Sequence, residues 1–478
     1  MYFTGKLRLF AAVAFAAIAS VALLSQPALP QQASRPQDRC PLNPLDSPLP
    51  LGVVGIPKDA CRNYTTKDFG DMAWQTFKTL VWPAVMTNPS KRGEPDTLLP
   101  ITRKGPLVFE TYKADWETFN KDGVTPPLVW DKYPETADVC AGAPPINHGS
   151  LVLGSIHKFG NLDAAFGRLE APSFHILVSQ KGSLVRYLTS FGKQTFNTIL
   201  DNGLYGPLAV GRSEEEPVWP RLFDPGSVTI KSAWIEMDGY SEAEKLNFHT
   251  RKALVQKPDS DPAKRTCSET LVGLVALHVA HKTESSRQWI WASFEHIRNV
   301  PNSGQSDGNA YTFHDGKSTM LSAPPPKATF PLDDPFTIPT PFNVERQQVI
   351  AQVIRDLNDT WRDILKDTVW SNYRLVTVQW PRYKDRAKMT GADRDEPGKP
   401  TATPLPPCFD WVGANVSVAN PVMETFLQLD SHCGMNKTCM SCHNRARNYD
   451  FIWSIPKKDH EHDKAAISVL REIMWGKR

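Results

Sequence analysis

Two apolar runs decide the fold: LVGLVALHVAHK at residues 271–282 and QWIWASFEHIR at residues 288–298. Both are rich in aliphatic, β-branched and aromatic residues, and each has the length of a strand. Only the short polar stretch 283–287 separates them, which is typical of a turn. We therefore predict an antiparallel hairpin at the centre of a sheet.

The segments around this hairpin indicate an α+β fold. Alternating or apolar runs predict further strands at residues 173–179, 183–188, 227–236 and 373–380. Apolar stripes of helical period predict helices at residues 68–82 and 190–201, and one that follows a cap at Asn343 and carries its stripe from Val349 to Leu365. We expect one large domain at residues 68–400, with an antiparallel sheet plus helices.

The composition excludes several classes of protein. The 478 residues include 54 Lys and Arg against 51 Asp and Glu, a net charge of +3, so no strongly basic face for nucleic acid is expected. Hydrophobic residues make up 41% of the chain and include 14 Trp, which excludes wholesale disorder.

The first residues have the pattern of an export signal. Lys6 and Arg8 precede an apolar run at 9–24, which is short for a membrane span of about 20 residues. We expect residues 1–33 to be a signal peptide that directs the protein to the periplasm. The alternative is that the segment stays uncleaved and anchors the chain to the membrane.

The region after this leader is rich in Pro, Gln and Ser from about residue 34 to about residue 62. Residues 34–67 are therefore expected to form an arm along the surface rather than a core element.

The most specific motif in the chain is CMSCH at residues 439–443. The C-x-x-C-H spacing is typical of covalent haem attachment, in which Cys439 and Cys442 bind the porphyrin and His443 is the axial ligand of the iron. We therefore expect one haem c. A zinc site that also uses Cys433 and His432 or His443, and a redox-active disulfide of Cys439 and Cys442, are the alternatives.

The six other cysteines form an even set in a chain that we expect to be exported, which favours disulfides. Fifteen connectivities are possible, and one or two free thiols remain the alternative. The simplest pairing is Cys40–Cys61, Cys408–Cys433 and Cys140–Cys267.

The motif lies in a C-terminal haem segment that we place at residues 405–478. A short helix is expected to begin at Asn420–Pro421, and a last helix at about residues 463–475. The distal side of the iron is either open or filled by another residue. The candidate distal ligands are Met474, Met423, Met435, His296, His460 and His462.

Three histidines lie on the predicted hairpin. Since side chains alternate along a strand, His278 and His281 should point to opposite faces, and so should Glu295 and His296. A metal site shared by His278, His281 and His296 is therefore not expected, and hydrogen-bonded structural histidines are the simpler interpretation.

Several stretches resemble a family of exported bacterial "cytochrome c family" proteins. They are WQTF at 74–77 with FETY at 109–112, the hairpin from VGL at 272–274 to NVP at 299–301, and PVMETF at 421–426 followed by the CMSCH motif. The resemblance covers about residues 70–453 and implies one haem beside a large non-haem region. It implies no reaction, and it leaves the tail after Trp453 without an interpretation.

The sequence thus predicts an exported monohaem c-type cytochrome that transfers single electrons to or from a redox partner protein or a small reductant or oxidant. Its alternative is a haem-dependent oxidoreductase or peroxidase-like enzyme with a substrate pocket in the large domain. The third possibility is a binding or structural protein in which the haem only stabilises the fold. Whether the chain is an enzyme stays open.

Overall fold

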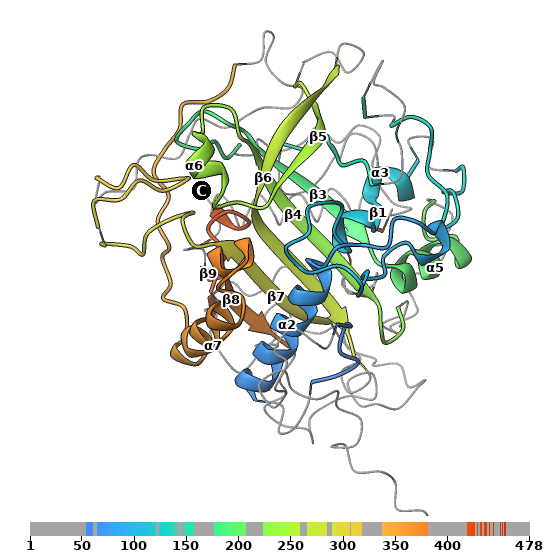
Figure 1. Cartoon of the computed structure of the whole chain (residues 1–478), viewed down its shortest axis with the longest axis horizontal. Coiled ribbons are helices and arrows are strands. Elements are labelled where there is room, and N and C mark those ends of the chain that lie inside the picture. The colour runs from blue at the N-terminus through green and yellow to red at the C-terminus, as the bar shows by residue number, and fades with distance from the viewer. Residues whose placement is uncertain are drawn as a thin grey trace, which may run out of the picture. The chain divides into compact units, whose positions relative to one another are not determined.

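The computed structural model is built around one long strand, β6 (Cys267–Lys282), which has two neighbours along one edge. β4 (Val228–Glu236) pairs with the other edge. On the shared edge, β5 (Thr250–Gln256) pairs with residues 267–273, and β7 (Trp289–His296) pairs with residues 276–282. The sheet therefore forks along β6, and the predicted hairpin, β6 and β7, is confirmed at its centre (Figure 1).

Each branch of the sheet continues outward from these strands. The remaining strands are β3 (Val185–Phe191) beside β4, β1 (Lys113–Ala114) beside β3, β2 (Val152–Leu153) beside β5, and β8 (Tyr373–Gln379) beside β7. β2 and β5 pair in parallel, whereas the other pairs among the described strands are antiparallel. The sheet is thus mixed rather than purely antiparallel, and the α+β class is confirmed.

The structure describes the core of the chain and parts of its C-terminal region. The described residues are 54–60, 65–120, 124–137, 139–140, 146, 149–156, 176–206, 223–258, 265–283, 289–305, 307–317, 337–380, 418–425, 428, 431–432, 435–436, 439, 443, 450, 452 and 454–455. The expected signal peptide, most of the Pro-rich arm and the expected last helix lie outside them.

The fork needs a glycine at the point where the two branches separate. Gly273 pairs with Ile235 of β4 on one side and with Thr250 of β5 on the other. A Cβ atom there would lie 2.5 Å from Met237 Sδ and 3.3 Å from Phe248 Cβ, closer than ordinary contact. The Met237 and Phe248 side chains can pack onto the strand here because residue 273 has no side chain of its own.

Two helices cover one face of the sheet beside β8. α2 (Thr66–Leu80) begins at a capping box, in which Thr65 Oγ1 accepts the Asp68 N–H and the Asp68 carboxylate accepts the Thr65 N–H. α7 (Gln352–Ile364) packs against α2, and both pack against β8 (Figure 1). The helix expected at 68–82 is confirmed, shifted two residues toward the N-terminus.

The prediction that Asn343 caps the N-terminus of α7 is wrong. α7 begins after Ala351, and the Asn343 side chain instead accepts the backbone N–H of Asp315 at 2.9 Å. The chain before α7 is held by loop contacts, since the Val344 N–H donates to the Phe313 carbonyl. A hydrogen bond to a distant loop has therefore replaced the local cap.

Aromatic rings fill the space between these helices and the sheet. Trp74 stacks on Trp361 with ring centroids 5.6 Å apart, and its edge meets Phe294 of β7 at 5.0 Å. Asn358 lies among them: its Oδ1 accepts the Trp74 indole N–H and the Leu375 N–H, while its Nδ2 donates to the Leu375 carbonyl. One buried amide thus ties α2, α7 and β8 together.

The remaining helices are short and lie at the margins of the sheet. α5 (Lys193–Asp201) packs on β3 and β4. The others are α3 (Asp115–Thr118), α6 (Glu242–Lys245) and the 3-10 helices η2 (Pro89–Lys91), η3 (Phe109–Thr111) and η6 (Val369–Asn372). Two short strands, β9 (Ser431–His432) and β10 (Met435–Asn436), form a separate pair. Where the chain is described, no helix is long and apolar enough to cross a bilayer.

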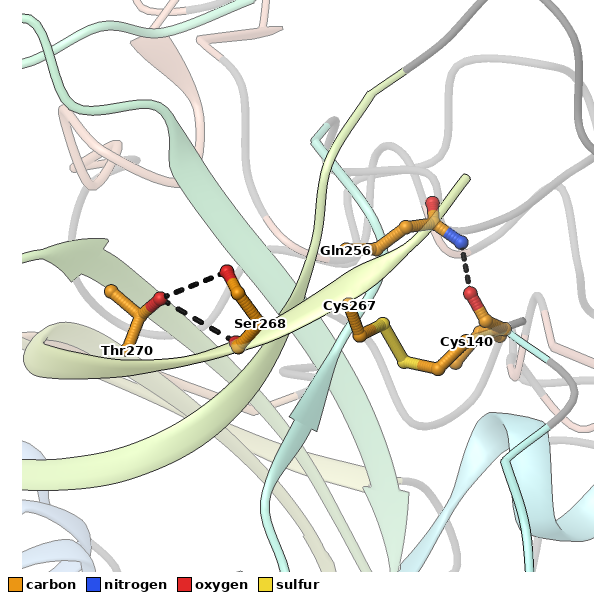
Figure 2. Close-up of a disulfide and its surroundings, with 6 residues drawn as sticks. Cys140, Gln256, Cys267, Ser268 and Thr270 are labelled. Atoms are coloured by element: carbon orange, nitrogen blue, oxygen red, sulfur yellow. Dashed lines mark hydrogen bonds between the residues drawn. A yellow bond between two sulfur atoms is a disulfide. The ribbon is translucent and has the colours of Figure 1, made fainter. Parts of the chain in front are cut away.

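A disulfide fastens the start of β6. Cys267 is bonded to Cys140, 127 residues earlier, and Gln256 of β5 donates to the Val139 carbonyl next to it (Figure 2). This is one of the three expected pairings, and it is confirmed. Cys40, Cys61, Cys408 and Cys433 lie outside the described residues.

Candidate functional site

One face of the central strands carries the C-terminal residues. Trp289, Trp291 and Ser293 of β7 share this face because they alternate along the strand. Their cross-strand partners Lys282 of β6 and Gln379 of β8 lie on it too. We call this the docking face; Phe294, which packs against α2, points to the opposite side.

The first motif cysteine is held by a side chain of β8. The backbone N–H of Cys439 donates to Gln379 Oε1 at 2.7 Å. Gln379 pairs across the sheet with Trp291, so the two side chains are neighbours on the docking face. Cys439 is half-buried against the aromatic core.

The motif histidine lies against Trp291. The imidazole of His443 and the indole of Trp291 have ring centroids 4.0 Å apart, with their planes tilted by 39°. Cys439 and His443 both have helical backbone, and His443 follows Cys439 by four positions in the sequence. Cys439 therefore contacts the docking face through Gln379, and His443 contacts it through Trp291. Cys442 lies outside the described residues.

A buried ion pair holds the chain just after the motif. The Lys282 ammonium donates to the Asp450 carboxylate and to the Phe223 carbonyl, and both charged side chains are almost fully buried. The Asp450 carboxylate also accepts the Phe223 N–H, and its backbone carbonyl accepts the Trp289 indole N–H at 2.8 Å. Asp450 therefore joins β6, β7 and residue 223.

The chain before the motif is also held on the docking face by hydrogen bonds. Asn420 Nδ2 donates to Ser293 Oγ at 2.9 Å and to the Phe294 carbonyl at 3.1 Å. The Tyr187 hydroxyl of β3 donates to the Val422 carbonyl at 2.9 Å. Asn420 Oδ1 accepts the Val422 N–H, which makes a turn where a short helix was expected.

Further along the docking face, Glu295 is buried between two arginines. It accepts hydrogen bonds from Arg346 and from Arg374, the latter at 2.7 Å. Burial opposes ionisation of Glu295, but Arg346 and Arg374 outweigh it and keep the pKa of this carboxyl below its usual range. His296 points away from Glu295, as predicted.

His296, one candidate distal ligand, is engaged at both ring nitrogens. Its Nε2 lies 2.9 Å from the Asn247 carbonyl, and its Nδ1 accepts the Arg298 N–H at 3.2 Å. The ring stacks on Phe248 with centroids 4.1 Å apart, and burial lowers the pKa of His296 to about 4. This arrangement leaves His296 no lone pair for iron.

The three candidate methionines are placed differently. Met423 is buried in a cluster with Ala276, Tyr187 and Val422. The backbone of Met435 lies in β10, and its side chain is outside the described structure. Met474, like His460 and His462, lies outside the described residues.

The other two hairpin histidines point to opposite faces, as predicted. His278 Nε2 lies 3.6 Å from Glu424 Oε1. His281 is buried on the other face, and within the described structure its ring nitrogens have no hydrogen-bond partner. Burial lowers the pKa of His281 to about 4. The described residues contain no group of three or more His, Cys, Asp or Glu that could hold a metal ion.

A separate cluster of charges, which the sequence analysis missed, lies near β5. Glu110 is buried, with its Oε1 2.7 Å from His249 Nε2 and its Oε2 2.5 Å from Arg251 Nη1. Burial opposes ionisation of Glu110, but Arg251 and His249 keep its pKa below the usual range. A cavity of about 20 Å³, lined in part by Arg92, Glu110 and Tyr133, has room for about one water.

The sequence motif identified Cys439 and His443, but it gave no sign of the residues that hold them. Gln379, Trp291 and Asp450 belong to no motif, and only a prominent tryptophan pair on a predicted strand hinted at Trp291. Comparison of the chain with protein-family models, with curated proteins and with solved structures finds no match.

Proposed function

We propose that this chain is an exported monohaem c-type cytochrome that transfers one electron at a time. The observation that carries the proposal is the contact of Cys439 with Gln379 and of His443 with Trp291, two side chains that are neighbours on the docking face. Covalent haem attachment needs two thiols and an imidazole in this order, and CMSCH supplies all three.

The residues present fit a c-type haem. Cys439 and Cys442 would form the two thioether links, and His443 would be the axial ligand. Cys439 is half-buried, and Cys439 and His443 both lie against the docking face beside the neighbouring residues Gln379 and Trp291, so both could meet one porphyrin. When bound, the haem supplies an iron that alternates between the ferric and ferrous states.

The large domain supports this site by fixing the segment that carries it. Asn420 before the motif, Gln379 at its first cysteine and Lys282 after it each hold the chain on the docking face. We propose that the domain keeps the haem in one orientation toward its redox partner. Since His296 is engaged and Met423 is packed in the core, Met435 and Met474 are the remaining methionine candidates for the distal position.

The disulfide and the N-terminal sequence both bear on the cellular compartment of the protein. The Cys140–Cys267 disulfide is typical of an oxidising environment, which agrees with the export signal expected at residues 1–33. We propose a periplasmic protein, bound to the membrane only if that segment is uncleaved. Its partners would be a redox protein or a small reductant or oxidant, because a haem that changes oxidation state needs an electron donor and an acceptor.

The test is the visible absorption spectrum of the purified protein, reduced and then exposed to carbon monoxide. We expect a low-spin, six-coordinate ferrous haem that does not bind carbon monoxide. A five-coordinate haem that binds it would favour the oxidoreductase alternative. The absence of a haem spectrum from protein matured in a strain that attaches haem c would overturn the proposal.

A further inference from the structure

The indole N–H of Trp291 is a buried donor beside the haem motif. Trp291 is 7% exposed, and its Nε1 atom has no acceptor among the residues that the structure describes. Trp289, two residues earlier on the same face, donates its indole N–H to the Asp450 carbonyl. Buried donors are nearly always bonded, because an unbonded one loses its hydrogen bond to water without replacement.

Trp291 lies where the haem motif docks on the sheet. The Trp291 ring is in contact with the ring of His443, the proposed axial ligand, at a centroid distance of 4.0 Å. The edge of a porphyrin is apolar except for its two propionate carboxylates. An ionised carboxylate is a strong acceptor for a buried N–H.

Resting on the proposed function, we infer that Trp291 Nε1–H donates a hydrogen bond to a propionate carboxylate of the bound haem. Trp291 is then a cofactor-binding residue. Its neighbour Gln379, whose side-chain oxygen accepts the Cys439 N–H, is a positioning residue.

This hydrogen bond has a defined effect on the iron. The donor draws negative charge from the carboxylate, whereas an unbonded carboxylate favours the more positive ferric state. The other charged or titratable groups placed on this face are Cys439, His443, Lys282 with Asp450, His278 with Glu424, and Glu295 with Arg346 and Arg374. Substitution of Trp291 leaves all of them in place.

The experiment compares Trp291→Phe with Trp234→Phe in the haem-loaded protein. Phenylalanine keeps a ring beside His443 and removes the N–H. We expect Trp291→Phe to shift the reduction potential downward and to change the propionate bending bands in the resonance Raman spectrum. Trp234→Phe removes a buried indole N–H that donates to Ser232 Oγ within β4, and it should leave both properties unchanged. Unchanged values in Trp291→Phe, or equal shifts in the two variants, would overturn the inference.

A second measurement needs no substitution. In the unsubstituted holoprotein, exchange of the indole N–H for N–D should shift a propionate bending band. If no such band responds to deuterium, the inference is wrong even where Trp291→Phe fails to fold. If the unsubstituted protein carries no haem, the proposed function fails instead, so the two failures are distinguishable.

Discussion

Lys282 and Asp450, 168 residues apart in the chain, form an ion pair that is almost fully buried. Asp450 has a left-handed backbone, with φ at 50°, a conformation that Asp tolerates better than most residues. Its carboxylate, its carbonyl and Lys282 together connect β6, β7 and Phe223. The chain after the haem motif is thus fastened to the centre of the sheet rather than to its edge.

Removing one partner of this pair should be costly. In Asp450→Ala, the Lys282 ammonium is left buried without its counter-charge, so we expect the free energy of unfolding to fall by about 3–5 kcal/mol. Urea unfolding followed by tryptophan fluorescence measures it.

The matched control is the exposed pair Lys252–Glu269. Glu269→Gln should leave the free energy of unfolding nearly unchanged, since exposed ion pairs contribute little to stability. Equal losses in Asp450→Ala and Glu269→Gln would contradict the account of the buried pair.

Substitution of the buried Asn358 should lower the stability of the protein. Asn358→Ala removes three buried hydrogen bonds and leaves the Trp74 indole N–H and both Leu375 backbone groups unsatisfied. We expect a loss of about 2–4 kcal/mol in the free energy of unfolding. Thr360→Ala, on the exposed side of the same helix, is the control and should cost less than about 1 kcal/mol. If Asn358→Ala loses no more free energy of unfolding than Thr360→Ala, the Asn358 amide does not hold α2 and α7 to the sheet.

The disulfide closes a loop of 127 residues, so it constrains the unfolded chain strongly. Cys140→Ser should lower the free energy of unfolding by about 2–5 kcal/mol. Cys267→Ser and the double variant should give the same loss, because each breaks the same bond. Additive losses in the double variant would show that the two sulfurs are not bonded to each other.

Acid should destabilise the protein through its buried histidines. Burial lowers the pKa of His281 and of His296 to about 4, so between pH 6.5 and pH 4 the unfolded chain binds more protons than the folded one. Stability therefore falls as the pH falls through this range, by about 3 kcal/mol for each histidine.

His281→Leu should remove roughly half of this loss, and because the ring nitrogens of His281 have no partner among the described residues, it should not destabilise the protein at pH 7. Urea midpoints at several pH values measure both effects. An unchanged acid-induced loss in the variant would be inconsistent with a buried neutral His281.

The sequence predicts those elements whose pattern is local. The hairpin at 271–298 and β8 carry strand-like runs, and α2 carries both a cap and an apolar stripe. β5 was not predicted, because Thr250, Arg251 and Lys252 interrupt the apolar run with half-exposed and exposed polar residues at its start. The cap at Asn343 failed because a loop 28 residues away binds that side chain.

In the candidate site, too, only the local motif could be predicted from the sequence. CMSCH is a local motif and can be recognised in one chain, whereas the Gln379 contact with Cys439 spans 60 residues and that of Lys282 with Asp450 spans 168. Such pairs depend on how β6, β7 and β8 align. No spacing in the sequence encodes that alignment.

The most direct measurement is a denaturing gel stained for haem peroxidase activity. We expect the unsubstituted protein, matured in a strain that attaches haem c, to give a stained band at the mass of the chain. The double variant Cys439→Ala, Cys442→Ala should lose the stain completely, while Cys140→Ser with Cys267→Ser, which removes as many cysteines elsewhere, should keep it. An unsubstituted band without stain, or a stain that survives in Cys439→Ala, Cys442→Ala, would contradict covalent haem attachment at this motif.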